Sequence, residues 1–171
     1  MLKNTTKKYG SVARAFHWSV ALLVLAMLPL GFLMNSPSAY ITHKSIGLII
    51  LMVMIGRTFW RLTNPSPSHH DLPSIFRLAA YVTHLGLYIT ILTMAFSGWM
   101  MSTASGHPPR FLGKIELAMP HIPLNKTLAK LAHETHEIVV WGLISLISLH
   151  ILAAIYHHFI RRDKVLSSML S

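Results

Sequence analysis

The sequence predicts an all-α integral membrane protein, a four-helix bundle with both termini in the cytoplasm. Of its 171 residues, 53% are hydrophobic and only 12% are charged, which is more apolar surface than a soluble fold of this size could bury. The apolar residues gather in four runs, each long enough to cross a hydrocarbon core of about 30 Å. No linker, repeat or low-complexity tract divides the chain, so residues 1–171 are expected to form one domain.

The first two runs predict an antiparallel pair of membrane helices, over about residues 15–34 and 43–62. The first run begins where a signal peptide would, but it is longer than the usual apolar segment of one, and three similar runs follow it. The loop between the runs is short and contains Pro37, so the second helix should return beside the first. Arg57 and Arg61 mark the far end of the second helix.

The other two helices are expected over about residues 75–102 and 133–160. Two prolines within residues 64–67 end the second helix before the third begins. The long connection at 105–131 is polar and rich in proline, and a basic cluster at 161–164 stops the fourth helix.

The basic residues predict the orientation of these helices. Ten of the fifteen Lys and Arg residues lie at the termini or around the connection between the second and third helices, against five at Lys44 and in the long loop. This excess places both termini in the cytoplasm and the long loop in the periplasm. A net charge of +10 would suggest a nucleic-acid partner in a soluble protein, but here membrane lipid is expected and nucleic acid is not.

Histidines are the candidate functional residues. The chain has no cysteine, which excludes disulfides, iron–sulfur clusters, c-type haem attachment and thiolate zinc sites, and it has twelve histidines. An ionisable side chain within a membrane span is a functional candidate because burying it in lipid is costly. His17 opens the first helix, His43 opens the second, and His136 and His150 both lie on the fourth.

The spacing of these four histidines suits two haems. His136 and His150 are fourteen residues apart, hence about 40° apart around the helix and roughly 21 Å along it. Bis-imidazole haem ligation takes two neutral imidazoles from facing helices. His43 with His136 would hold a haem near the periplasm, and His17 with His150 a second one nearer the cytoplasm. His133 lies about 100° off the face of His150, which favours His136 as the ligand.

Other histidines leave alternatives open. His157 follows His150 on almost the same face, and counting depth alone favours His157 as the partner of His17. His84, on the third helix, could be a ligand, a proton carrier or a packed polar residue. The rest, which are expected at the surface, are His69, His70, His107, His121 and His158.

Several short segments together resemble the bacterial cytochrome b561 family of small di-haem membrane proteins. They are Phe16-His17-Trp18, His43-Lys44-Ser45-Ile46-Gly47, His84-Leu85-Gly86-Leu87-Tyr88, His136-Glu137, Leu149-His150 and His157-His158. The resemblance covers nearly the whole chain. The segments in this order indicate the family more specifically than any single segment does.

This resemblance implies a ligand set. Matching positions bind haem in that family, which implies two haem b groups held by His17 with His150 and by His43 with His136. The family's His-Glu-Thr triplet matches His133 literally, whereas the spacing selects His136. The periplasmic ligand therefore stays open between these two residues.

The resemblance also implies the function. His84 and His157 would belong to a quinone pocket, where an imidazole can hydrogen-bond a quinone carbonyl and pass protons. Electrons would cross the bacterial inner membrane from a periplasmic donor, through both haems, to ubiquinone. One type of family member oxidises superoxide, and the basic periplasmic loop would suit such an anionic donor. The chain would then be an oxidoreductase of the superoxide:ubiquinone type or an electron carrier.

Two alternatives remain from the sequence. The chain could be the haem b subunit that anchors a periplasmic dehydrogenase and passes its electrons to quinone. It could instead be a haem-free transporter of protons or metal ions, because imidazole also binds zinc, nickel and copper. The transporter interpretation lacks paired intramembrane acids, since all five Asp and Glu residues lie in loops or at helix ends.

Overall fold

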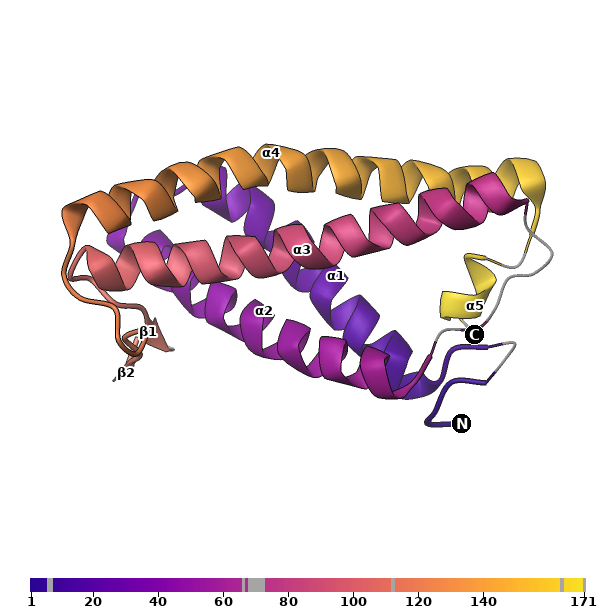
Figure 1. Ribbon diagram of the computed structural model, residues 1–171, viewed down its shortest axis with the longest axis horizontal. Coiled ribbons are helices and arrows are strands. Elements are labelled where there is room, and N and C mark those ends of the chain that lie inside the picture. The colour runs from indigo at the N-terminus through magenta and orange to yellow at the C-terminus, as the bar shows by residue number, and fades with distance from the viewer. Residues whose placement is uncertain (6–7, 66, 68–72, 112, 164, 171) are drawn as a thin grey trace.

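The computed structural model describes the whole chain except residues 6–7, 66, 68–72, 112, 164 and 171. Its four long helices are α1 (Ser11–Phe32), α2 (Pro37–Thr63), α3 (Ser74–Ala104) and α4 (Lys126–Tyr156) (Figure 1). All four are long and apolar enough to cross a membrane, with mean hydropathies of 1.9, 1.6, 1.5 and 2.4 over an 18-residue stretch of each span, and the fourth span continues from α4 to Arg161. The predicted all-α membrane four-helix bundle is therefore confirmed.

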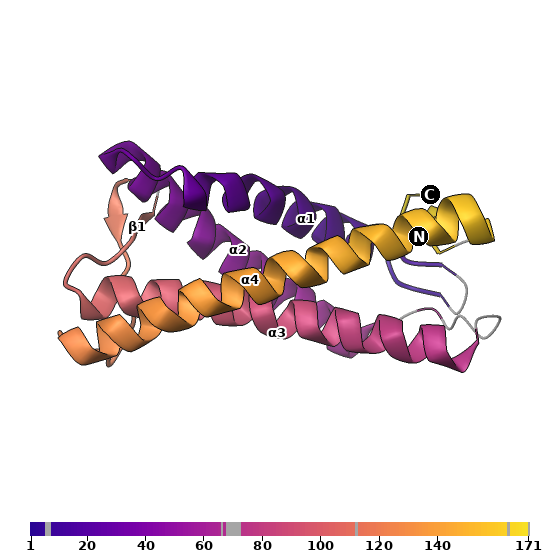
Figure 2. The ribbon, with the colours of Figure 1, turned by 90° about the horizontal axis from the view of Figure 1, so that it is seen from above.

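The helices form two antiparallel pairs. α1 packs against α2 and α3 packs against α4, while α2 also contacts α3 (Figure 2). The core between the pairs is thin and consists of Val20, Val24, Ile50, Met54, Ile91 and Leu143. Most other large apolar side chains on the helices are exposed, which in a bilayer places them against lipid.

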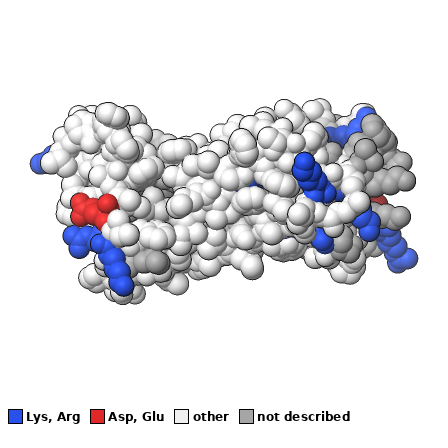
Figure 3. Space-filling model, turned by 90° about the horizontal axis from the view of Figure 1, so that it is seen from below, with Lys and Arg blue, Asp and Glu red and all other residues white. Residues whose placement is uncertain are grey.

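The two ends of the bundle differ. Both termini lie at one end, and a small β-hairpin lies at the other (Figure 1). Lys and Arg side chains gather toward these two ends, with a broad band free of charged side chains between them on the face in Figure 3. Such a band is what a hydrocarbon core requires of a protein that spans it.

Polar caps set where α2 and α4 begin. The Ser36 hydroxyl accepts a hydrogen bond from the Ala39 amide (3.3 Å), and Pro37 follows as the first helical residue. The Asn125 side chain accepts from the Leu128 amide (3.0 Å). Because of this cap, α4 begins at Lys126. The sequence predicts a later start, at about residue 133.

The connection between α3 and α4 folds back over one end of the bundle. Strands β1 (Arg110–Phe111) and β2 (Ile115–Glu116) pair antiparallel. The Ser45 hydroxyl on α2 donates to the carbonyl of Arg110 (2.9 Å), and the Thr103 hydroxyl on α3 accepts from the amide of Met119 (3.0 Å). These bonds hold the loop against the first half of α2 and the end of α3.

The C-terminal end of α4 widens into a different local structure. A single π-helical turn, η1 (His157–Arg161), follows α4, and Arg162 then adopts a left-handed conformation with φ of 53°. The short helix α5 (Ser167–Leu170) returns toward α1, where the Trp18 indole donates to the carbonyl of Met169 (3.1 Å). His157 is the first residue of the π-helical turn.

Candidate functional site

The first histidine pair joins α2 to α4. The ring centroids of His43 and His136 are 6.3 Å apart, with the ring planes at 67°. On the other side of His136, the hydroxyl of Ser97 on α3 lies 3.1 Å from Nδ1. Nδ1 of His43 is buried and has no hydrogen-bond partner among the described residues.

Two glycines make room for this pair. A Cβ atom on Gly98 would lie 3.1 Å from Cε1 of His136, and one on Gly31 would lie 3.3 Å from Cε1 of His43. Both distances are shorter than an ordinary carbon–carbon contact of about 3.5–4 Å. The imidazoles thus lie where a neighbouring helix carries no side chain.

The second pair joins α1 to α4. The ring centroids of His17 and His150 are 6.2 Å apart, with the planes at 65°. The ring of His84, from α3, is 5.3 Å from that of His150. Nη1 of Arg57, from α2, lies 3.2 Å from Nδ1 of His17. All four helices therefore contribute a side chain here.

The ring separation in both pairs fits an iron ion between the rings. An imidazole nitrogen binds a transition metal at about 2 Å, and the ring centroid lies about 1 Å further away, so two rings on one ion have centroids about 6 Å apart. No group of three or more His, Asp or Glu that could hold a metal ion occurs among the described residues. Each pair is thus suited to a cofactor that supplies the remaining ligands itself, as a porphyrin does.

His133 lies away from both pairs. It is exposed, and its Nε2 lies 3.3 Å from a carboxylate oxygen of Glu137. Of the two residues left open by the sequence, the structure places His136 beside His43. Similarly, it places His150, and not His157, beside His17.

His157 lies at the end of α4 in a separate setting. It is only 8% exposed, and its ring meets the edge of Phe76 on α3 at 5.8 Å between centroids. Its Nδ1 is 2.5 Å from the Asp163 carboxylate. Partial burial alone would raise the pKa of Asp163, but hydrogen bonds from His157 and the Val165 amide and the charges of His157 and Arg161 outweigh it and hold this pKa below its ordinary value.

The remaining histidines are exposed where the structure describes them. His107 and His121 lie in the long loop, and His158 lies on η1, with no place in either pair. His69 and His70 lie outside the described residues.

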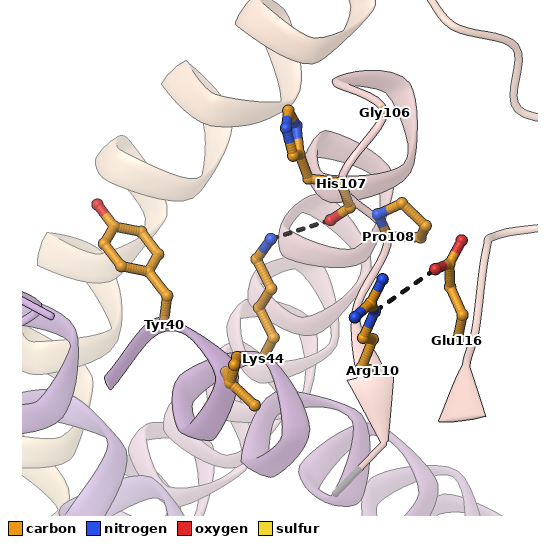
Figure 4. Close-up of a pocket in the computed structure, with 8 residues that line it drawn as sticks. Tyr40, Lys44, Gly106, His107, Pro108, Arg110 and Glu116 are labelled. Carbon is orange, nitrogen blue, oxygen red and sulfur yellow. Dashed lines mark hydrogen bonds and ion pairs between the residues drawn. The ribbon is translucent and has the colours of Figure 1, made fainter. Parts of the chain in front are cut away.

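A cavity of about 250 Å³ opens beside the hairpin (Figure 4). Its lining residues include Tyr40, Lys44, His107, Arg110 and Glu116. One of them, Lys44, directly follows His43 in the chain. The Lys44 ammonium donates to the carbonyl of His107 (2.9 Å), and Arg110 pairs with Glu116 at 3.5 Å (Figure 4). Arg110 has an acidic partner, whereas Lys44 forms no ion pair with a carboxylate among the described residues.

Three side chains at these sites do not follow from the histidine pattern. They are Ser97, Arg57 and Asp163. Arg57 could have been noticed as a cation inside an apolar run, although the sequence also explains it as a helix-end marker. Ser97 and Asp163 carry no comparable signal, because their roles depend on which way neighbouring helices face.

Comparisons with known proteins identify the family. The model of the family described as prokaryotic cytochrome b561 matches residues 8–171. Cytochrome b561 homolog 2 of Escherichia coli (strain K12) is 34% identical, over 98% of this chain and 93% of the relative. Cytochrome b561 homolog 1 of the same organism is 30% identical, over 90% and 92%. The probable superoxide oxidase CybB of Yersinia pestis is also 30% identical, over 96% of both chains.

The membrane spans, the facing histidines and these matches agree with one another. The chain is a multi-pass protein of the bacterial inner membrane, and its family transfers electrons across that membrane through haem b. It belongs to the prokaryotic cytochrome b561 family.

Proposed function

We propose that the chain binds two haem b groups, one between His43 and His136 and one between His17 and His150, and carries electrons from a periplasmic donor to ubiquinone. The observation that supports this most directly is the pair of ring separations, 6.3 and 6.2 Å, each suited to one iron ion. His136 and His150 on α4 set the two sites roughly 21 Å apart along the helix. The haems supply the one-electron chemistry, and the chain fixes their spacing and keeps water away.

The side chains around the pairs have defined tasks in this proposal. Ser97 can accept a hydrogen bond from Nδ1 of His136, which leaves Nε2 of that ring free to bind iron. Gly98 and Gly31 leave space beside the imidazoles. A partner that fixes the second nitrogen of a ligand histidine is typically worth about 10–100-fold in metal affinity.

His84 and His157 are proposed to serve the quinone. His84 lies next to His150 and is exposed on α3, so it can reach a molecule that arrives from the lipid. His157 is held by Asp163, a carboxylate at the aqueous end of α4 that can exchange protons with water. Reduction of ubiquinone takes two electrons and two protons, and imidazoles are suited to deliver the protons.

The donor is proposed to be an anion that reaches the hairpin end. Lys44, which no described carboxylate pairs with, lines the cavity beside the hairpin and follows His43 in the chain. Superoxide is the specific candidate, because the Yersinia pestis relative is a probable superoxide oxidase. Two superoxide anions would give up one electron each and leave as molecular oxygen, which balances the reduction of one ubiquinone.

The test is the haem content of the detergent-purified protein. A pyridine haemochrome assay should give about two haems per chain, and reduced-minus-oxidised spectra should be of the b type. Addition of a superoxide source should then reduce added ubiquinone in step with superoxide loss. A protein that stays haem-free after expression with ample haem would contradict the proposal and favour transport. Two haems without superoxide activity, in a preparation that retains a larger partner, would favour the anchor-subunit role.

A further inference from the structure

Arg57 is a partly buried cation that lies beside one histidine pair only. Its Nη1 is 3.2 Å from Nδ1 of His17, and its Nε donates to the hydroxyl of Tyr88 (2.9 Å). Its guanidinium carbon also lies 5.4 Å from the centre of the Tyr88 ring. All of these contacts are to neutral groups, so they leave the charge of Arg57 unbalanced.

No carboxylate that the structure describes pairs with Arg57. The four described acids have other partners: Glu116 pairs with Arg110, Glu134 with Lys130, Glu137 with His133, and Asp163 with His157 and Arg161. Arg14 lies one turn before His17 on α1, and its Nε is buried with no hydrogen-bond partner among the described residues. Cations in a low-dielectric interior are costly without an anion, so this end of the bundle is suited to an anionic ligand.

If His17 binds iron, Arg57 has a greater need for an anionic partner. A neutral imidazole that binds iron through one nitrogen carries its proton on the other, so that nitrogen donates and cannot accept. Arg57 has only donors. With His17 bound to iron, Arg57 therefore needs a different acceptor, and haem b itself carries carboxylate groups of the required charge.

At the other histidine pair, no described cation contacts a ring as Arg57 contacts that of His17. The group next to His136 is the neutral hydroxyl of Ser97. The nearest cation in the chain, Lys44, is also partly buried, but its ammonium donates to the loop carbonyl of His107 (Figure 4). The energy between two charges falls with distance, so Arg57, which touches a ring of its pair, should act more strongly on its site than Lys44 does on the other.

We propose that Arg57 is the counter-ion for a haem carboxylate at the His17/His150 site, and that its charge makes this the higher-potential haem of the two. The inference rests on the proposed function. Reduction adds one negative charge to a haem, and a nearby fixed cation in a low dielectric favours the reduced state. Electrons would therefore collect at the His17/His150 site, which gives the relay its direction, away from the hairpin and toward the end that holds the termini.

The experiment is a redox titration of the purified holoprotein and of Arg57→Gln, Arg57→Lys and Lys44→Gln. In Arg57→Gln the midpoint potential of the His17/His150 haem should fall. The equilibrium distribution of an electron between the two haems should then shift by about tenfold or more toward the His43/His136 haem. Arg57→Lys keeps the charge and should retain most of the wild-type difference. Lys44→Gln removes a charge that is directed to a loop carbonyl and should shift either potential less.

The His150→Ala background identifies the affected haem. If that variant retains only the haem at His43/His136, adding Arg57→Gln should leave the remaining potential unchanged. Loss of one haem from Arg57→Gln, with Arg57→Lys retaining both, would also support the counter-ion role. Unchanged potentials in Arg57→Gln, or a shift as large in Lys44→Gln, would overturn the inference. A wild-type protein without two haems would instead refute the proposed function.

Discussion

At the scale of single residues, two neighbouring histidines on α4 differ in what they face. His136 lies beside His43 inside the bundle, whereas His133 is exposed and pairs with Glu137. We predict that His136→Ala lowers the haem content from about two per chain to about one, because one iron loses an axial ligand. His133→Ala should keep both haems. Pyridine haemochrome assays of the two variants measure this directly, and haem loss from His133→Ala alone would reverse the assignment.

The sequence predicts the positions of the ligand candidates but not their surroundings. Helical periodicity places His136 and His150 on one face of α4 because both belong to the same helix, whose geometry is fixed. The contact between Arg57 and His17 depends on how α1 and α2 rotate against each other. Periodicity within one helix carries no such information, so this contact becomes visible only in the packed bundle.

At the scale of helices, glycines control how closely α3 approaches α4. A Cβ on Gly98 would lie 3.1 Å from Cε1 of His136, whereas one on Gly142 would have no neighbour within 4 Å. We predict that Gly98→Ala displaces the imidazole, at a cost of about 1–3 kcal/mol for overpacking, and loosens the haem at that site. Gly142→Ala is the matched control and should leave both haems in place.

Transfer of haem to apomyoglobin measures this difference between the glycine variants. Gly98→Ala should release one haem faster than the wild type, while the second haem leaves at the wild-type rate. Equal rates of haem release from the two glycine variants would mean that the imidazole of His136 does not need the space that Gly98 leaves.

The turn that follows α4 should respond to pH through Asp163. Its carboxylate accepts hydrogen bonds from His157 and from the Val165 amide (3.1 Å), which help to lower its pKa in the fold. A carboxyl with a depressed pKa stabilises the fold fully above its ordinary value of 3.8, and the contribution is lost as the pH falls through the lowered value. We predict that the hydrogen-exchange protection factor of the Val165 amide falls severalfold across this acid range.

Asp163→Asn provides the control for that experiment. Its protection factor at Val165 should be low already at neutral pH and should change little as acid is added. A wild-type protection factor that stays constant through the same range would show that Asp163 does not hold the turn.

Helix ends were less predictable than helix number. The four apolar runs give four helices, yet α4 begins at Lys126, well before its apolar run, because Asn125 caps it. Its first turns carry the polar residues that the sequence suggests are loop. Hydropathy reports which residues can enter lipid, and a helix may extend beyond the lipid wherever a cap satisfies its first amides.

At the scale of the whole molecule, the charges and the connections divide the bundle into two unlike ends. One end holds both termini, and the other holds the β-hairpin with its cavity (Figure 1). The proposed quinone residues lie toward the first end and the proposed donor cavity lies at the second. Which aqueous compartment each end meets therefore decides whether a periplasmic donor could reach the cavity.

We predict that the end with the termini faces the cytoplasm, because ten of the fifteen Lys and Arg residues belong to it. Green fluorescent protein fused at the C-terminus should fluoresce, and alkaline phosphatase inserted at Gly113, in the hairpin turn, should be active. Neutral replacements of Arg161 and Arg162 should weaken this preference, whereas the same change at Lys114 should strengthen it. An active phosphatase at the C-terminus would place Lys44 and the cavity in the cytoplasm, where no periplasmic superoxide could meet them, and the proposed donor would then be wrong even if both haems were present.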